Sequence, residues 1–159
     1  MSSIRFVTGD ATAPVGDDPR VICHICNDSG GWGRGFVLAV SRRWPQPEAD
    51  YRDWYRGRGR NDFGLGRIRL IEVGPSLWVA NMVAQAGVRA TAAGPPIRYE
   101  ALEACLGLLA QECLGHGASV HMPRIGAGLA GGDWGVIEEI VRRQLVGPGI
   151  RVTVYDLPV

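Results

Sequence analysis

HICNDSGGWGRGFVLAVSRRWP, residues 24–45, is the stretch that decides the fold of this chain. It closes an apolar run that begins at Val21 and turns polar at Asn27, and four glycines follow between positions 30 and 35. A helix-like apolar pattern then begins at Gly35. Glycine costs conformational entropy on folding, so a cluster between a buried strand and a helix indicates close approach of the backbone to a ligand or to itself.

Outward from this stretch, apolar periodicity predicts alternating strands and helices. Strands are expected at 4–7, 21–26, 67–73, 77–85, 118–123 and 150–157, and helices at 35–43, 47–56, 99–114 and 134–145. The turn at Gly74-Pro75 predicts that the third and fourth strands form a hairpin. The order favours one domain over residues 1–159, an α/β fold with a central mixed sheet in a three-layer α/β/α sandwich.

The composition is that of an ordinary globular domain. The chain has 159 residues, 46% hydrophobic and 21% charged, with a net charge of +1, so no basic field for nucleic acid stands out. The sequence begins without a charged leader or an apolar signal core, and no apolar run is long enough to span a membrane. We therefore expect a cytoplasmic monomer with no membrane partner.

Four cysteines raise the question of a metal or redox site. Cys23 and Cys26 form a C-x-x-C, but they lie in a strand pattern, where side chains three apart point to opposite faces. Cys105 and Cys113 fall on a predicted helix without matching spacing. The sequence therefore predicts four small buried side chains and neither a metal nor a cofactor.

Two glycine-rich loops each follow a buried strand and precede a helix, at 27–35 and 124–133. In an open α/β sheet this is the crevice at the carboxyl ends of the strands, where ligands bind. Backbone N–H groups exposed by glycine, together with a helix N-terminus, suit phosphate. The chain has no Walker A motif, and its glycines are out of register with the dinucleotide fingerprint, which disfavours a nucleotide kinase or a Rossmann dehydrogenase.

Four segments, in order, resemble the ADP-ribose-binding loops of macrodomains: VTGDATA, HICNDSGGWGRGF, MPRIGAGLAGGDW and VTVYDL. MPRIGAGL is the most specific of them. It is most similar to the branch that contains terminal ADP-ribose protein glycohydrolase and its bacterial relatives. The resemblance covers nearly the whole chain.

The resemblance implies a site for ADP-ribose. Asp10 is expected to accept a hydrogen bond from the adenine amino group, and Asn27 to reach the distal ribose. Tyr155 is placed either near the adenine or in the core, and both interpretations stay open. The remaining residues expected at the ligand are Ala11, Trp32, Gly33, Gly35, Arg124, Ile125, Gly126, Ala127, Gly128 and Leu129, with residues 125–129 offering backbone N–H groups to the phosphates.

Glycohydrolases of this branch use a lysine and an aspartate, and here the lysine position falls on or near Gln85 and the aspartate position on Ala130. The chain contains no lysine, which excludes a lysyl Schiff base. The candidate catalytic residues are Asn27 and Gln85, which could orient a water, and Asp133, whose GGDW context fits a helix N-cap better than a general base. For Gln85, a polar residue that ends a strand is an equally good interpretation. The expected partners are ADP-ribose and ADP-ribosylated proteins, with nucleic acid only as an ADP-ribosylated substrate. Three functions are compatible with the sequence: a hydrolase that acts on modified acidic residues, a non-catalytic ADP-ribose reader, and an ADP-ribose 1″-phosphate phosphatase.

Overall fold

The computed structural model describes residues 3–158, which build one six-stranded sheet. The strands lie in the order β1-β6-β5-β2-β4-β3, with β3 antiparallel to β4 and every other neighbouring pair parallel. Their bounds are β1 Ile4–Thr8, β2 Arg20–Asn27, β3 Ile68–Gly74, β4 Leu77–Gln85, β5 Ser119–Met122 and β6 Val152–Asp156. The sheet is mixed, as predicted, and the hairpin of β3 and β4 is confirmed.

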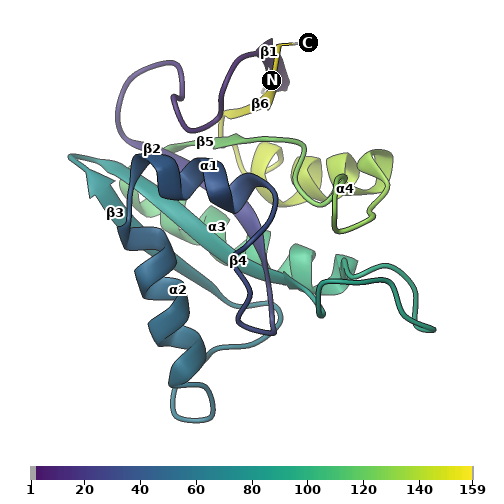
Figure 1. Ribbon diagram of the computed structural model, residues 1–159. Helices are drawn as coiled ribbons and strands as arrows, with labels where there is room; N and C mark the ends of the chain where they lie inside the picture. The colour runs from purple at the N-terminus through teal and green to yellow at the C-terminus, as the bar shows by residue number, and fades with distance from the viewer. Residues whose placement is uncertain (1–2, 159) are drawn as a thin grey trace.

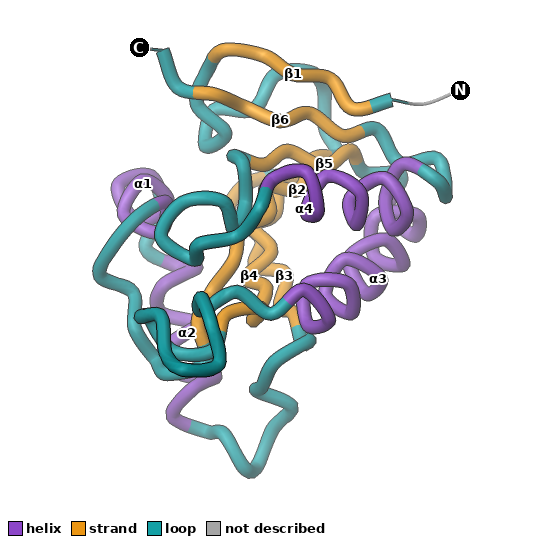
Figure 2. The backbone as a smooth tube through the Cα atoms, turned by 90° about the vertical axis from the view of Figure 1, so that its right-hand side faces the viewer, coloured by secondary structure: helices purple, strands orange, loops and turns teal. Residues whose placement is uncertain are grey.

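Helices cover both faces of this sheet, which gives the three layers seen edge-on in Figure 2. One face carries α1 (Phe36–Arg43) and α2 (Gln46–Arg56), and the other carries α3 (Tyr99–His116) and α4 (Trp134–Val141) (Figures 1 and 2). A π-helical segment, η1 (Arg142–Val146), continues α4. The α/β fold class is therefore confirmed.

The central strands β2 and β4 are mostly apolar and mostly buried, because both of their faces are covered. On the face of α3 and α4, the core includes Leu102, Leu106 and Leu109, which lie at helical spacing on one side of α3. On the other face, Trp32 and Tyr51 pack in a second cluster. Cys23 belongs to the first cluster and Cys26 to the second, so their side chains lie on opposite faces, as predicted.

Most element boundaries lie within two residues of the prediction, and α4 is the main exception. The apolar pattern predicted an α-helix to residue 145, but α-helical bonding ends at Val141. From there Gly147 donates its amide hydrogen to the carbonyl of Arg142 at 2.8 Å, an i→i+5 bond. Side-chain periodicity does not separate α from π bonding over so few residues, because both bury one face.

The parallel strands β2, β4 and β5 bring three chain segments to one edge of the sheet. Their carboxyl ends are at Asn27, Gln85 and Met122, and each is followed by a loop.

Within residues 3–158, no helix has both the length and the apolar character needed to cross a bilayer.

Candidate functional site

The first glycine loop is organised by the side chain of Asn27, at the end of β2. Its Oδ1 accepts hydrogen bonds from the amides of Ser29 and Gly31, both at 3.0 Å, and its Nδ2 donates to the carbonyl of Gly31 at 2.9 Å. The hydroxyl of Tyr51, on α2, lies 2.9 Å from the same Oδ1. Asn27 thus ties the loop to the strand end while one amide hydrogen stays available.

The second glycine loop runs from β5 to α4, and its glycines Gly126 and Gly128 have different surroundings. Gly126 has a φ of 74°, and a Cβ there would collide with the Cδ1 of Ile97. By contrast, a Cβ at Gly128 would meet nothing within 4 Å. The first glycine serves packing, and the second leaves open space beside the backbone.

The backbone amides of this loop divide into two groups. Among residues 3–158, no acceptor lies within hydrogen-bond reach of the N–H groups of Gly126, Gly128 and Leu129. Ile125, however, donates to the carbonyl of Pro123 at 2.7 Å, and Ala127 to that of Arg124 at 3.3 Å. The expectation that all five amides face a ligand is therefore corrected, because two of them close turns within the loop.

Two adjoining cavities lie between the loops, with volumes of about 310 and 260 Å³. Both are lined by Ile25, Arg34, Val37, Gln85 and Leu129, so they are parts of one cleft. Ligand clefts commonly measure roughly 300 to 1,000 Å³. The cleft brings together most of the residues predicted for the ligand: Asn27, Trp32, Gly33, Gly35, Gln85, Arg124, Ile125, Gly126, Gly128 and Leu129.

The residues predicted for the adenine lie apart from this cleft. The Oδ1 of Asp10 accepts hydrogen bonds from the amide and hydroxyl of Thr12, at 2.8 and 2.7 Å. Burial tends to raise the pKa of Asp10, but these bonds and the charge of Arg43 outweigh it, so the pKa is lowered and the carboxylate is ionised at neutral pH. Asp10 lines a separate hollow of about 490 Å³ beside the end of α1.

Ala11 and Tyr155 are both buried. Ala11 is only 2% exposed as a whole residue, backbone included. Tyr155 is 4% exposed, and its hydroxyl accepts a hydrogen bond from the amide of Val15 at 2.9 Å and lies 2.7 Å from Nδ1 of His121. Of the two interpretations of Tyr155, this geometry favours the core aromatic.

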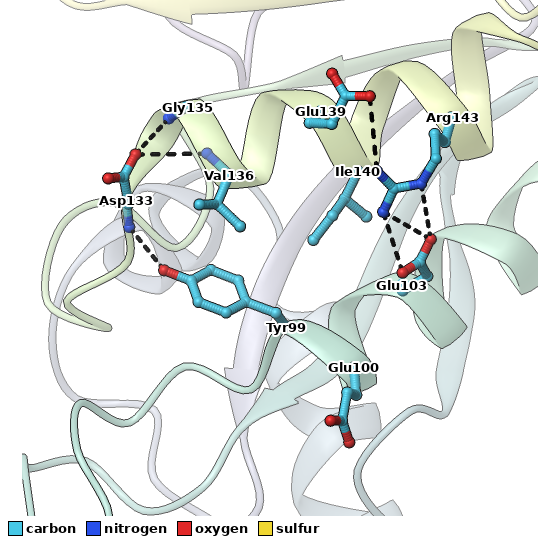
Figure 3. A pocket seen from close by; sticks show the side chains of 9 residues that line it. All are labelled: Tyr99, Glu100, Glu103, Asp133, Gly135, Val136, Glu139, Ile140 and Arg143. Carbon is cyan, nitrogen blue, oxygen red and sulfur yellow. Dashed lines mark hydrogen bonds and ion pairs between the residues drawn. The ribbon is translucent and has the colours of Figure 1, made fainter.

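Asp133 does not line the cleft. Its carboxylate accepts hydrogen bonds from the amides of Gly135 and Val136 at 2.8 and 3.4 Å, which makes it the N-cap of α4. It borders an open groove of about 660 Å³ between α3 and α4, and its own amide donates to the hydroxyl of Tyr99 (Figure 3). This geometry favours the helix-cap interpretation of Asp133, which is not among the residues that line the two cavities beside Gln85.

Comparison with solved structures identifies the fold family. A macrodomain protein from Streptomyces coelicolor is 53% identical, covers 97% of this chain and 99% of its own, and superposes with a TM-score of 0.88. The chain belongs to the macrodomain family. A protein of unknown function from Bacteroides thetaiotaomicron is 50% identical, with 98% and 99% coverage and a TM-score of 0.95. No family model matched the sequence.

More distant relatives of this macrodomain carry functional names. Chromodomain-helicase-DNA-binding protein 1-like from Mus musculus is 34% identical over 99% of this chain, which spans only 18% of that protein. An ADP-ribose 1″-phosphate phosphatase from Saccharomyces cerevisiae is 34% identical over 40% of this chain and 36% of its own length. The structure of Thermosipho africanus DarTG in complex with ADP-ribose shares the fold, with 18% identity, a TM-score of 0.69, and coverage of 88% of this chain and 38% of its own.

Within the macrodomain cleft, two residues predicted to contact the ligand direct their polar groups to other residues of the protein. The indole of Trp32 donates to the hydroxyl of Ser41 at 2.7 Å, and its ring packs against Tyr51 with centroids 5.4 Å apart. The guanidinium of Arg124 forms a bidentate pair with Asp156, at 2.7 and 3.0 Å. Both side chains therefore shape the walls, and the positive charge of Arg124 is already balanced.

Two other arginines that sequence reasoning missed line the cleft. Arg34 lies in the first glycine loop and borders both cavities, while Arg89, on the loop after β4, borders only the larger one. Arg34 could have been found, since it stands inside the glycine cluster. Arg89 carried no such signal, because only the parallel pairing of β2 with β4 brings its loop to this edge.

Proposed function

We propose that this macrodomain binds ADP-ribose and removes single ADP-ribose groups from modified acidic residues of proteins. The observation that carries the proposal is the placement of two amide side chains, Asn27 and Gln85, at adjacent strand ends in a cleft bordered by two glycine loops. The relatives named for ADP-ribose compounds support the same ligand.

In this proposal the diphosphate lies against the second loop. The N–H groups of Gly126, Gly128 and Leu129 have no acceptor among residues 3–158, and a phosphate would supply one. The open space at Gly128 allows close approach. The distal ribose then lies toward Asn27 and Gln85, in the larger cavity.

Cleavage is proposed to proceed by direct attack of water. The bond between the distal ribose and a Glu or Asp side chain is an ester, and its carboxylate is a good leaving group. The main contribution of the protein to the rate is therefore to position the attacking water. Gln85 donates one amide hydrogen to the carbonyl of Gly87 at 2.9 Å, which fixes its orientation and leaves the amide oxygen for a water. A lysyl intermediate has no place in this scheme, because the chain contains no lysine.

Two alternatives remain. A non-catalytic reader would need only the binding part of the site. Phosphatase activity on ADP-ribose 1″-phosphate is favoured by the similarity to the yeast enzyme, which covers 40% of this chain.

The deciding experiment is incubation with a protein that carries Glu- or Asp-linked mono-ADP-ribose, with chromatography of released ADP-ribose. We expect catalytic release together with micromolar binding of ADP-ribose in calorimetry, about −8 kcal/mol. Binding of ADP-ribose without its release from the modified protein would support the non-catalytic reader. No binding of ADP-ribose would refute both the hydrolase and the reader. The phosphatase is tested by release of inorganic phosphate from ADP-ribose 1″-phosphate.

A further inference from the structure

A β-bulge at the end of β4 sets the position of Gln85. Cys26 of β2 lies opposite Val83, but the next residue of β2, Asn27, lies opposite Gln85. Ala84 is therefore an extra residue in β4, and without it Gln85 would not face Asn27. A bulge redirects side chains and interrupts the ladder of hydrogen bonds between strands. Contacts outside the ladder must then fix the side chain of Gln85.

Asp28, the first residue after β2, supplies such contacts. Its amide donates to the carbonyl of Gln85 at 2.9 Å, and its Oδ1 accepts a hydrogen bond from the amide of Gly87 at 2.8 Å. The side chain of Gln85 donates to the carbonyl of the same glycine, also at 2.9 Å. The N–H group of Gly87 is thus held by Asp28, while its carbonyl holds Gln85.

Gly87 transmits the effect of Asp28 to Gln85. Its φ is 68°, in the left-handed region that glycine adopts more easily than other residues. Since the backbone of glycine is the most free to rotate, an anchor on its N–H group restricts the direction of its carbonyl. Asp28 itself is not among the residues that line the two cavities of the cleft, so its carboxylate acts on the cleft only through this connection.

We propose that Asp28 is a positioning residue of the hydrolase. Through Gly87 it holds the side-chain amide of Gln85 in the orientation that presents the amide oxygen to the attacking water. This inference rests on the proposed function, and it gives Asp28 no part in proton transfer. The required feature is an acceptor oxygen at this position, which asparagine keeps and alanine removes.

Kinetics on the full chain test the role in turnover. Asp28→Ala should lower kcat for release of ADP-ribose from a Glu- or Asp-linked protein about tenfold or more, with KM changed less than about twofold, because a misdirected amide slows the reaction without removing a binding contact. Asp28→Asn should keep kcat within about threefold, whereas a general base would lose the same rate in both variants. Asp17→Ala, at an exposed aspartate on the loop after β1, is the matched control and should leave kcat unchanged.

A double-mutant cycle tests whether Asp28 acts through Gln85. In the Gln85→Ala background, Asp28→Ala should lower kcat by less than about a further twofold, because the amide that it positions is already gone. Independent roles for the two residues would instead multiply their separate effects.

NMR spectroscopy tests the positioning without any turnover. The side-chain amide signals of Gln85, identified by their disappearance in Gln85→Ala, should shift in Asp28→Ala and stay in place in Asp28→Asn. The amide hydrogen of Gly87 should exchange with solvent faster in Asp28→Ala, since it loses its acceptor.

The outcomes separate this inference from the proposed function. Absence of turnover in the wild-type protein would refute the hydrolase, and the NMR comparison would still decide whether Asp28 orients Gln85. Unchanged Gln85 signals in Asp28→Ala, an equal loss of kcat in Asp28→Ala and Asp28→Asn, or multiplied effects in the double-mutant cycle would overturn the role of Asp28 alone.

Discussion

Asn27 and Gln85 are register partners at the ends of the parallel strands β2 and β4, yet their side-chain amides differ in the hydrogen bonds that they make within the protein. The Oδ1 of Asn27 accepts hydrogen bonds from the first glycine loop, whereas the side chain of Gln85 makes a single bond, to the carbonyl of Gly87. Just beyond this pair, the amide of Asp28 donates to the carbonyl of Gln85 at 2.9 Å, so the strand ends hold each other. Substitutions at the two positions should therefore have different consequences.

Gln85→Ala should slow ester cleavage by about 10²-fold with little effect on ADP-ribose binding, since it removes an orienting amide but no loop contact. Asn27→Ala should slow cleavage at least as much, and should also weaken ADP-ribose binding and lower the melting temperature, because it frees the loop. Release of ADP-ribose, calorimetry and thermal unfolding measure the three effects. Gln111→Ala, on the exposed side of α3, is the matched control. Wild-type turnover in both cleft variants would move the reacting centre elsewhere.

The second loop offers a comparison between two glycines. Gly128→Glu should abolish ADP-ribose binding and leave the melting temperature nearly unchanged, because the side chain enters open space where the proposal places the diphosphate. Gly126→Ala should instead destabilise the protein by about 1 to 3 kcal/mol, owing to its positive φ and the contact with Ile97. Circular dichroism and calorimetry distinguish the two. Retained binding in Gly128→Glu would place the phosphates outside this loop.

Asp133 tests capping against catalysis. Asp133→Ala should cost about 1 kcal/mol of stability through loss of the cap, with turnover largely intact. Asp133→Ser should restore the melting temperature, since serine also caps helices, although it has no carboxylate. A general base would behave in the opposite way, with both variants losing orders of magnitude in rate.

Two buried histidines should make stability depend on pH. Burial lowers the pKa of His24 to about 4, despite its 2.6 Å hydrogen bond to Asn81. Burial and the charges of Arg20 and Arg151 lower that of His121 to about 4 as well. Both folded values lie below the ordinary 6.5, so the unfolded chain binds more protons between pH 6.5 and 4.

The free energy of unfolding should therefore fall as pH is lowered through this window, on the order of 2 kcal/mol at pH 5 for the fully buried His24. Urea denaturation at pH 7.5 and pH 5 measures the difference. His121→Gln should reduce the slope of stability against pH, even though the variant starts from a lower stability. Equal stability at both pH values would show that neither histidine is held neutral by burial.

The sequence by itself determined the fold class, because the apolar run at residues 77–85 directly follows a turn signal, and the stripe from Leu102 to Cys113 has helical spacing. The sequence also placed the two glycine loops at strand ends, because a glycine cluster between an apolar run and a helical pattern can be recognised from neighbouring residues alone. The tertiary structure decided what each loop residue does. It directed the carboxylate of Asp133 to the amides of α4, buried Tyr155 against His121, and paired the amides of Ile125 and Ala127 with carbonyls of their own loop. It also brought Arg89 into the cleft with Arg34, although they stand far apart in the chain. Strand and helix follow from local periodicity, whereas the direction of a loop side chain depends on partners that only the packing of distant segments supplies.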